Sequence, residues 1–580
     1  MSGQARQTGF PASGGAGWSS DQTATWRGGG GNAWWHPKAL LALDFVNDRA
    51  FRCGAEPLLT SALALTRAGN ARMLDAHSVW QSFASNLLAR IGGMGADLHG
   101  GYTNKIRNPR GEGGTAGVIG SGGALPTYWA TAGVPSGVSV AFLGAGEEGG
   151  LPYCDIRFFG TAGSAAASNR VHFNDNANAT ATAGQAWGLD FRAKLIAGTA
   201  PDAMARLAAY ATGSLLAGAN DSGSMTLDGT VKYLSVRKVL ADPTANNARG
   251  ALVVPLANGV SYDFTIRIYA PKLVQLPVLE GPEIVVNGSL ASDTVWTKGN
   301  GWTIAAGSAE KAATSSSSLS QSAALVPGQT YKVSMALVRL GGNFRFRIAG
   351  GANVESDDFS STGTYTRYLT AVAGNNTFGV FATGGFSAGS VDDVSCRDVS
   401  AGYMPVFPIL PVAGAPGDST RAADVAVAQD FASWVTPVIG AGASALVAGE
   451  ISHTGDGAAR VLFEYSDGSA TNVIRGFIGT ANKPSLLIVS GGVTQVTCEL
   501  SVPAATGLAR FAFGWGAGGG YIADQAGNTA TFGAVTLPAG LSQWHVGGGL
   551  AGQYVNDRLR QMQIGQPLTL AEAQTWTAAA

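Results

Sequence analysis

Charged side chains are scarce in this chain of 580 residues: Asp, Glu, Lys and Arg together make up 13% of it, about half the usual share. The formal net charge is −1, so no overall field attracts DNA or an anionic membrane. Nucleic acid is therefore not expected as a partner. The hydrophobic fraction of 46% nevertheless excludes wholesale disorder, which needs low hydrophobicity and high charge.

Long apolar runs are missing as well. No stretch approaches the roughly 18 apolar residues of a membrane-spanning helix, so membrane insertion is not expected. The opening residues, MSGQARQTGFPASGG, have neither a basic region nor an apolar core, and they are not expected to act as a signal peptide. The expectation is a protein made in a cytoplasm.

Sequence motifs of catalysis and metal binding are also absent. The histidines form no HExxH pattern, and no GxSxG elbow, Walker loop or Rossmann fingerprint occurs. The adjacent acidic pairs Glu147–Glu148 and Asp357–Asp358 would each face opposite sides of a strand. The chain is therefore not expected to be an enzyme. The cysteines form no CxxC pair, which indicates buried free thiols rather than a zinc or disulfide framework: Cys53, Cys154, Cys396 and Cys498.

Glycine is abundant, with 83 residues, and apolar residues alternate with polar ones in short segments. In AWGLDFRAKLIAG (186–198), Trp187, Leu189 and Phe191 share one face, and Asp190 and Arg192 lie on the other. This pattern is typical of an antiparallel sheet with one buried and one solvent-exposed face. The predicted fold class is all-β, with tandem antiparallel β-sandwich or jelly-roll modules and a flexible Gly-rich N-terminal arm.

The length suggests about three to five domains, and proline-rich segments indicate where the domain boundaries lie. The residue pattern of 201–218 is equally compatible with a helix and with strands. A short terminal helix is predicted, with Thr569 as N-cap and Glu572 three residues later. The expected organisation is an arm (1–40), a strand-rich connecting segment (41–110), a jelly roll (111–277), a second jelly roll (278–400), a Pro-rich linker (401–418) and a terminal sandwich (419–580).

The Gly-rich arm cannot form a core of its own, yet its tryptophans are costly to leave in water. Two explanations stay open: the arm docks into another subunit or partner, or it folds back onto its own first domain. The docking residues would be Trp18, Trp26, Trp34 and Trp35.

Several phrases resemble bacteriophage head-spike and tail-fibre proteins, in the order in which those proteins carry them. They are LDFVNDRAFRCG, LALTRAGNARMLDA, SFASN and YTNKIRNPRGEG. EGGLPYCDIRFFGTAG resembles the opening of a jelly-roll domain in the same family, and GPEIVVNGSLASDTVWTKGNGWTI through VDDVSC resembles its carbohydrate-binding-module-like domain. YMPVFP, followed by GDSTRAADVA, resembles the start of its C-terminal concanavalin-A-like sandwich.

The resemblance implies a protein of the virion surface, with other virion proteins of the capsid, portal region or tail as partners. It implies a homo-oligomer, with a trimer as one form, and non-catalytic attachment to host cell-surface polysaccharide. Two alternatives stay open: a purely structural capsid or tail decoration, and a polysaccharide-degrading tail spike. Location on the head or on the tail also stays open.

The tripeptide Thr-Arg-Ala occurs twice, at 66–68 and at 420–422. Chance is one explanation in an Ala-rich chain. The other is that each copy opens a strand at the start of a separate β-module in a mosaic chain.

A structural calcium ion is possible in the carbohydrate-binding-module-like domain, but no cofactor is expected with certainty. The related domains often begin NGDFE and pair this motif with a final DD around calcium, whereas this chain has NGSLASD. Alternatively, the final acidic pair binds backbone N–H groups at a strand end. The residues that could supply oxygen ligands are Glu283, Asp293, Asp392 and Asp393.

The segment GGNFRFRIAGG (341–351) predicts a glycan-binding face. Its apolar residues, Phe344, Phe346 and Ile348, should lie in the core. The other face would suit an acidic glycan, because guanidinium groups pair with carboxylates in fork geometry. The alternative is an ordinary solvated face whose arginines pair with Asp357 or Asp358. The binding residues would be Asn343, Arg345 and Arg347, with Tyr365 and Tyr368 as neighbours.

A second set of candidates lies in the terminal sandwich. In FAFGWGAGGGYIADQ (511–525), Phe511, Phe513 and Trp515 should face the core. Tyr521 and Asp524 would then lie at a loop or turn, where they could contact glycan.

Overall fold

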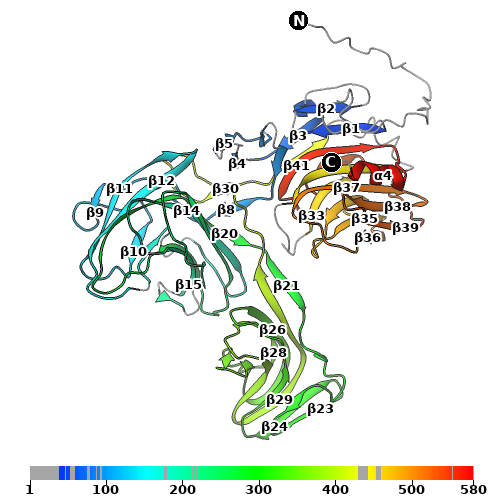
Figure 1. Cartoon of the computed structure of the whole chain (residues 1–580). Coiled ribbons are helices and arrows are strands. Elements are labelled where there is room, and N and C mark those ends of the chain that lie inside the picture. Colours follow the sequence, from blue (N-terminus) through cyan, green and yellow to red (C-terminus); the bar gives the residue numbers. More distant parts are fainter. Residues whose placement is uncertain are drawn as a thin grey trace, which may run out of the picture. The chain divides into compact units, whose positions relative to one another are not determined.

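The structure is a computed structural model, and many of its strands and helix α4 are labelled in Figure 1. The chain forms two compact units: unit 1 combines Met1–Gly101 with Arg421–Ala580, and unit 2 is Tyr102–Thr420. The fold is all-β, as predicted, and the described helices are α1 (Leu59–Ala62) and α4 (Leu570–Ala578). Neither of them is long and apolar enough to cross a membrane. The described residues are 38–45, 48–52, 59–68, 70–74, 79–86, 88–91, 95–166, 168–174, 179–211, 214–216, 220–428, 442–451, 459–550 and 553–578.

Unit 1 is built on two antiparallel sheets. The first has the order β2-β1-β41-β32-β37-β38-β39, with β7 beside β41 and β6 beside β7. Its strands are β1 (Ala39–Asp44), β2 (Arg49–Arg52), β6 (Arg90–Ile91), β7 (Gly95–Leu98), β32 (Gly442–Ile451), β37 (Gly507–Gly516), β38 (Gly519–Asp524), β39 (Thr529–Phe532) and β41 (Asp557–Gly565).

The second sheet of unit 1 has the order β3-β31-β40-β33-β34-β35-β36. A separate small pair joins β4 (Ala71–Leu74) to β5 (Trp80–Phe83). The strands of the second sheet are β3 (Leu63–Thr66), β31 (Val425–Ala428), β33 (Arg460–Ser466), β34 (Val473–Ile478), β35 (Pro484–Ser490), β36 (Val493–Glu499) and β40 (Gln543–Val546).

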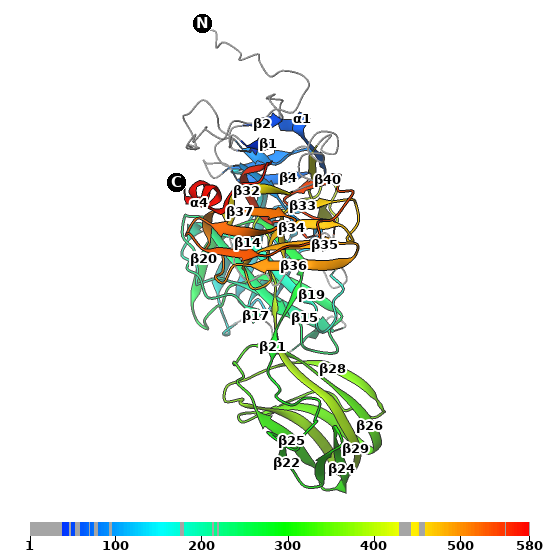
Figure 2. The same cartoon turned by 90° about the vertical axis from the view of Figure 1, so that its right-hand side faces the viewer.

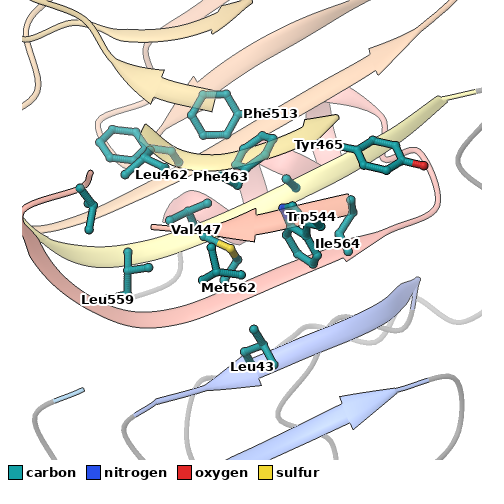
Figure 3. Packing of buried hydrophobic residues seen from close by; sticks show 14 of the residues in the cluster. Leu43, Val447, Leu462, Phe463, Tyr465, Phe513, Trp544, Leu559, Met562 and Ile564 are labelled. Carbon is teal, nitrogen blue, oxygen red and sulfur yellow. The ribbon is translucent and has the colours of Figure 1, made fainter. Parts of the chain in front are cut away.

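A single apolar core lies between these two sheets. Figure 3 shows side chains from both: Leu43 and Val447 come from the first sheet, and Phe463 and Trp544 from the second. Phe511, Phe513 and Trp515 on β37 are buried in the same core, as the alternating pattern predicted. Strands with one apolar face thus close a two-layer sandwich.

The N-terminal strands belong to this sandwich. All six residues of β1 are buried, so both faces and both edges of this strand need neighbours. β41 pairs with it on one side, placing Leu43 opposite Met562. β3 likewise pairs with β31, placing Leu65 opposite Ala426. The expectation of a connecting segment at 41–110 is therefore corrected, because its first strands complete the C-terminal sheets.

The two Thr-Arg-Ala copies also meet in unit 1. Thr66 is the last residue of β3, so the first copy follows a strand instead of opening one. The second copy lies partly in β30 (Ser419–Arg421). Arg67 and Arg421 share one buried carboxylate, that of Asp424. The expectation that the copies begin separate modules is wrong.

The first module of unit 2 is also a two-sheet sandwich. Its first sheet has the order β18-β14-β20-β12-β11-β9, and its second has the order β10-β13-β19-β15-β16, with β17 beside β15. The strands are β9 (Gly117–Val118), β10 (Ala130–Ala132), β11 (Val138–Glu148), β12 (Leu151–Thr161), β13 (Arg170–His172), β14 (Ala186–Gly198), β15 (Met204–Ala211), β16 (Ser214–Leu215), β17 (Asn220–Asp221), β18 (Lys232–Val239), β19 (Asn247–Val253) and β20 (Ser261–Leu276).

The core of this module follows the predicted alternation. Trp187, Leu189 and Phe191 on β14 are buried together with side chains from the opposite sheet, such as Leu207 and Leu252. The ambiguous segment 201–218 contains the strand β15, whose alternate residues face the core. Tertiary packing therefore decides against a helix at this point.

The Pro-rich linker packs against the first module. Met404, Phe407 and Ile409 are buried. The buried ammonium of Lys272, on β20, donates to the backbone oxygens of Pro405 and Phe407. Part of the predicted Pro-rich linker is therefore packed against a module: residues 402–409 form a strap, the name used below, held by apolar contacts and by a buried cation. A short pair of strands, β8 (Tyr102–Asn104) and β30, lies beside the strap's C-terminal end.

The second module of unit 2 is organised around two long antiparallel strands, β26 and β29, seen side by side in Figure 2. Near Gly341 the register shifts, and the buried positions of β26 change from odd to even numbers. Both halves of β26 therefore keep apolar side chains in one core. The strands are β21 (Val278–Glu283), β22 (Thr297–Lys298), β23 (Trp302–Ala305), β24 (Ser308–Thr314), β25 (Ser317–Ser322), β26 (Thr330–Ala349), β27 (Val354–Glu355), β28 (Gly363–Thr370) and β29 (Thr377–Ala401).

The terminal helix α4 begins with the predicted capping box. The backbone N–H of Glu572 donates to the Thr569 hydroxyl at 3.2 Å, and the Thr569 N–H donates to the Glu572 carboxylate at 2.7 Å. Lys38 pairs with the same carboxylate at 2.8 Å. The cap therefore also joins the first described residue of unit 1 to its last helix.

Candidate functional site

The solvent-facing side of the second module carries the candidate site. After the register shift in β26, Phe344, Phe346 and Ile348 are completely buried, as predicted. The alternate residues of β26 therefore point outward, beside Phe381 of β29 and two acidic residues. We call this surface the β26–β29 face, formed by Asn343, Arg345, Arg347, Glu355, Asp358 and Phe381.

Arginine and carboxylate groups form a continuous network on this face. Arg347 Nε lies 2.6 Å from Glu355 Oε1, and the two residues are opposite each other in the β26–β27 pair. Arg345 also donates to Glu355 and lies 2.8 Å from Asp358 through its Nε. Asn343 donates to Asp358 at 3.3 Å. The planar groups are thereby held side by side, with fixed orientations.

The centre of the face is an aromatic ring. Phe381 lies directly opposite Arg345 on one side and Ser318 of β25 on the other. The guanidinium carbon of Arg347 lies 3.2 Å from the Phe381 ring centroid. Such cation–π stacking holds the arginine flat against the sheet. The result is a low, planar surface with hydrogen-bonding groups around its edge.

The charges of the face balance one another. Partial burial opposes ionisation of Glu355, but hydrogen bonds from Arg345 and Arg347 outweigh it, so the pKa of this carboxyl lies below its ordinary value. Each guanidinium is therefore matched by an ionised carboxylate. Of the two predicted partners, Asp358 does pair with Arg345, whereas Asp357 pairs with Arg367. These contacts match the alternative prediction, a solvated face whose arginines are paired with carboxylates. The β26–β29 face therefore carries no excess positive charge that would attract an acidic glycan.

The two tyrosines predicted as neighbours do not form a common platform with the arginines. Tyr365 stacks on Phe359, with ring centroids 4.2 Å apart, and packs against the core. Tyr368 is an odd number of positions away on β28 and lies opposite Lys332 of β26. Because alternate residues face opposite sides of a strand, Tyr365 and Tyr368 point in different directions.

The two glycan-binding candidates in the terminal sandwich, Tyr521 and Asp524, are buried, so their prediction as contact residues is corrected. Tyr521 is 8% exposed, and its hydroxyl is hydrogen-bonded to Ser444 and to the Leu568 backbone oxygen. Helix α4 covers this part of β38, which the local alternation does not reveal. The carboxylate of Asp524 is also mostly buried and accepts backbone N–H groups of the following turn from Ala526 and Asn528. Neither side chain is available to a glycan.

The possible calcium ligands are not gathered into one site. Glu283 accepts hydrogen bonds from Ser395 and from the Cys396 backbone. Asp293 pairs with Lys298. Asp392 accepts the backbone N–H of Asp393, which resembles the alternative prediction for this acidic pair. Within the described ranges, no group of three or more His, Cys, Asp or Glu side chains could hold a metal.

Trp296 and Trp302, in the second module, are 6% and 4% exposed and belong to its core. The four docking tryptophans, Trp18, Trp26, Trp34 and Trp35, lie outside the described residues.

Sequence reasoning missed Phe381 and Glu355. Phe381 lies between the buried Val380 and Ala382, so its outward direction could have been predicted from the alternation in GVFATGG. The role of Glu355 could not be predicted, because its pairing with the arginines depends on the β26–β27 hairpin.

A related arrangement occurs on the first module. The guanidinium of Arg267 lies 3.5 Å from the Tyr153 ring centroid and pairs with Asp155 and Glu148. Hydrogen bonds from Lys194, Tyr269 and Arg267 lower the pKa of Glu148 to about 2. An arginine stacked on an aromatic ring and bracketed by carboxylates is therefore a recurring surface element of unit 2.

The chain matches no family model and no curated protein sequence. Among solved structures, it is similar to the CBM40 module of the Ruminococcus gnavus IT-sialidase bound to α2,6-sialyllactose. The identity is 13% over 23% of this chain and 82% of that one, with a TM-score of 0.21. It is also similar to the CBM22-1–CBM22-2 tandem of Paenibacillus barcinonensis Xyn10C, at 10% identity over 53% of this chain and 98% of that one, with a TM-score of 0.20.

A third similar structure is the Trypanosoma rangeli sialidase in complex with the inhibitor DANA, at 8% identity over 89% of this chain and 98% of that one, with a TM-score of 0.22. These three structures are thus two sets of carbohydrate-binding modules and one sialidase. At these TM-scores the likeness carries no inference about ligand or activity.

Proposed function

We propose that the chain is a bacteriophage virion surface protein that attaches to host cell-surface polysaccharide without cleaving it, and that the β26–β29 face contacts the glycan. The observation that carries this proposal is the Arg347 guanidinium, which lies flat over the half-buried Phe381 ring and is paired with Glu355. A flat, rigidly held guanidinium and its neighbouring carboxylates can exchange hydrogen bonds with sugar hydroxyls. The virion location rests on the ordered phrases that resemble head-spike and tail-fibre proteins.

The charge balance of the face favours a neutral glycan. Arg345 and Arg347 are matched by Glu355 and Asp358, so an anionic sugar would gain no net attraction. A neutral sugar can use the same groups as donors and acceptors. Attachment by several weak sites in many copies per virion would then provide avidity.

Binding without hydrolysis fits the ionisation of the carboxyl groups. A glycosidase general acid needs a raised pKa. The pKa of Glu355 is lowered, as is that of Asp357, where the hydrogen bonds from Arg367 are the main cause. These carboxylates stay ionised at neutral pH and are suited to accept hydrogen bonds from hydroxyls.

The test is binding of the full chain to host polysaccharide, compared between two matched arginine variants. Arg347→Gln removes the guanidinium stacked on Phe381. Arg157→Gln removes an arginine of the first module that stacks on Phe159 at 4.7 Å and pairs with Asp263. Only Arg347→Gln should weaken binding, by roughly threefold to tenfold, the value of one hydrogen-bonded contact. Equal effects of both variants, or release of reducing ends from the polysaccharide, would contradict the proposal.

A further inference from the structure

A second cluster of polar side chains lies on the first module, on the outer face of the β13–β19–β15 sheet. The core-facing residues of these strands include Val171, Leu207 and Leu252. The intervening residues therefore project to the opposite face. We call their polar members the Tyr210 cluster: Arg170, His172, Arg206, Tyr210, Asn247 and Arg249.

Tyr210 is the centre of this cluster. The guanidinium carbon of Arg249 lies 4.1 Å from its ring centroid. The His172 ring meets it edge-on, with the centroids 6.0 Å apart. Asn247 lies directly opposite Tyr210 in the β15–β19 pair. Side chains from three strands thus converge on one phenol.

Several polar atoms of the cluster are buried without a hydrogen-bond partner. They are His172 Nδ1, Arg170 Nε, the Tyr210 hydroxyl and Asn247 Oδ1. His172 is 5% exposed, and Tyr210 and Asn247 are each 3% exposed. Native folds leave few buried polar groups unsatisfied, because each loses its hydrogen bonds to water. The atoms of His172, Tyr210 and Asn247 lie around one ring, and Arg170, two residues before His172 on β13, is close enough for its charge to act on that imidazole. Together these atoms indicate a missing polar partner.

The surroundings of these atoms are electropositive. Arg206 is paired with Asp221, with both nitrogen–oxygen distances at 2.6 Å. Burial, together with the positive charges of Arg170, Arg249 and Arg206, lowers the pKa of His172 to about 3. The imidazole is therefore neutral at pH 7 and can carry its proton on Nδ1 as a donor.

We propose that the Tyr210 cluster binds an oxyanion, namely the carboxylate of an acidic sugar. Arg170 Nε–H, the Tyr210 hydroxyl and His172 Nδ1–H supply donors for the anionic oxygens. Asn247 Oδ1 supplies an acceptor, which suits a hydroxyl on the same sugar. This proposal goes beyond the β26–β29 face, because it concerns another module and a ligand of different charge.

The test uses the full chain, with sodium glucuronate, glucose, inorganic phosphate and sodium chloride as probes at matched ionic strength. Glucuronate should bind in calorimetry and raise the melting temperature, whereas glucose and sodium chloride should not. Tyr210→Phe keeps the ring and removes the hydroxyl, and Arg170→Gln removes one charge. Each variant should weaken glucuronate binding by roughly tenfold, since each removes a hydrogen bond to a charged group. Arg157→Gln, on the other sheet of the same module, should leave it unchanged.

The ligand-free variants provide a readout that separates binding from folding. Arg170→Gln relieves repulsion among like charges, so the ligand-free chain should melt at the same temperature as wild type or higher. The proposal is overturned if glucuronate and phosphate act no more strongly than sodium chloride, or if Tyr210→Phe and Arg170→Gln bind like wild type. If phosphate binds and glucuronate does not, the Tyr210 cluster is an oxyanion site, but the proposal that its ligand is an acidic sugar is overturned.

Discussion

Arg67 and Arg421, the arginines of the two Thr-Arg-Ala copies, bind the two oxygens of one carboxylate. Arg67 lies 2.8 Å from Asp424 Oδ1, and Arg421 lies 2.6 Å from Asp424 Oδ2. The His99 backbone N–H also donates to Oδ2, at 2.9 Å. The repeated tripeptide thus supplies two arginines of unit 1 that meet at a single buried anion.

Removing this anion should be strongly destabilising. Asp424→Ala leaves two buried guanidinium groups without their carboxylate, and breaking a buried ion pair in this way costs about 3–5 kcal/mol. The free energy of unfolding in urea measures the effect. Glu499→Gln, which removes an exposed pair with Lys483 in the same unit, should cost no more than about 1 kcal/mol. Similar losses in both variants would contradict the role assigned to Asp424.

The modules should differ in their ability to fold alone. A fragment of residues 421–580 lacks β1, β3 and β7, so β41 and β31 lose their neighbours. It should show no cooperative thermal transition by circular dichroism. A fragment of residues 278–401 contains every strand of the second module and should melt cooperatively. A cooperative melt of 421–580 would mean that the N-terminal strands are dispensable.

Acid should lower the stability of unit 2, because the Glu148 carboxylate becomes protonated. The three donors that hold its pKa at about 2, against 4.5 ordinarily, stabilise the fold above pH 4.5, and this contribution is lost as the pH falls towards 2. Glu148→Gln should therefore flatten the fall in melting temperature between pH 5 and pH 2.5. Glu147→Gln removes the adjacent exposed carboxyl and serves as the control. If both variants track wild type at every pH, Glu148 is not responsible.

The strap should contribute to the stability of the first module. Phe407 is 3% exposed, and truncating a buried phenylalanine to alanine typically costs about 3–5 kcal/mol. Phe407→Ala should lower the urea midpoint accordingly. Val406→Ala, at a neighbouring position that is 51% exposed, should change it little. A free spacer would make the two variants equivalent.

Local alternation predicted the inward faces of the strands, since a period of two directly separates core from solvent. It therefore placed Phe344, Phe346 and Trp187 correctly. It could not predict which strands become neighbours, because the pairing of β1 with β41 is decided by burial across the whole chain. For the same reason Tyr521 was misplaced: its strand alternates normally, but α4 covers the face to which it points.

The candidate face was predictable in part. The outward direction of Arg345 and Arg347 follows from their spacing, and the pairing of Arg345 with Asp358 belongs to one of the two alternatives. The charge balance depends on Glu355, which reaches the arginines only through a hairpin. The Tyr210 cluster was not predictable, because its members come from strands whose order in the sheet differs from their order in the sequence.

The contact between Lys38 and Glu572 joins residues 534 positions apart, and this has a consequence for synthesis on the ribosome. β1 emerges first, yet its partner β41 is among the last segments to be translated. Unit 2, encoded between them, has time to fold while β1 waits for β41, since domains generally fold as they emerge. With only β2 beside it, the apolar strand β1 is then a segment of the nascent chain that a chaperone would have to protect until translation ends.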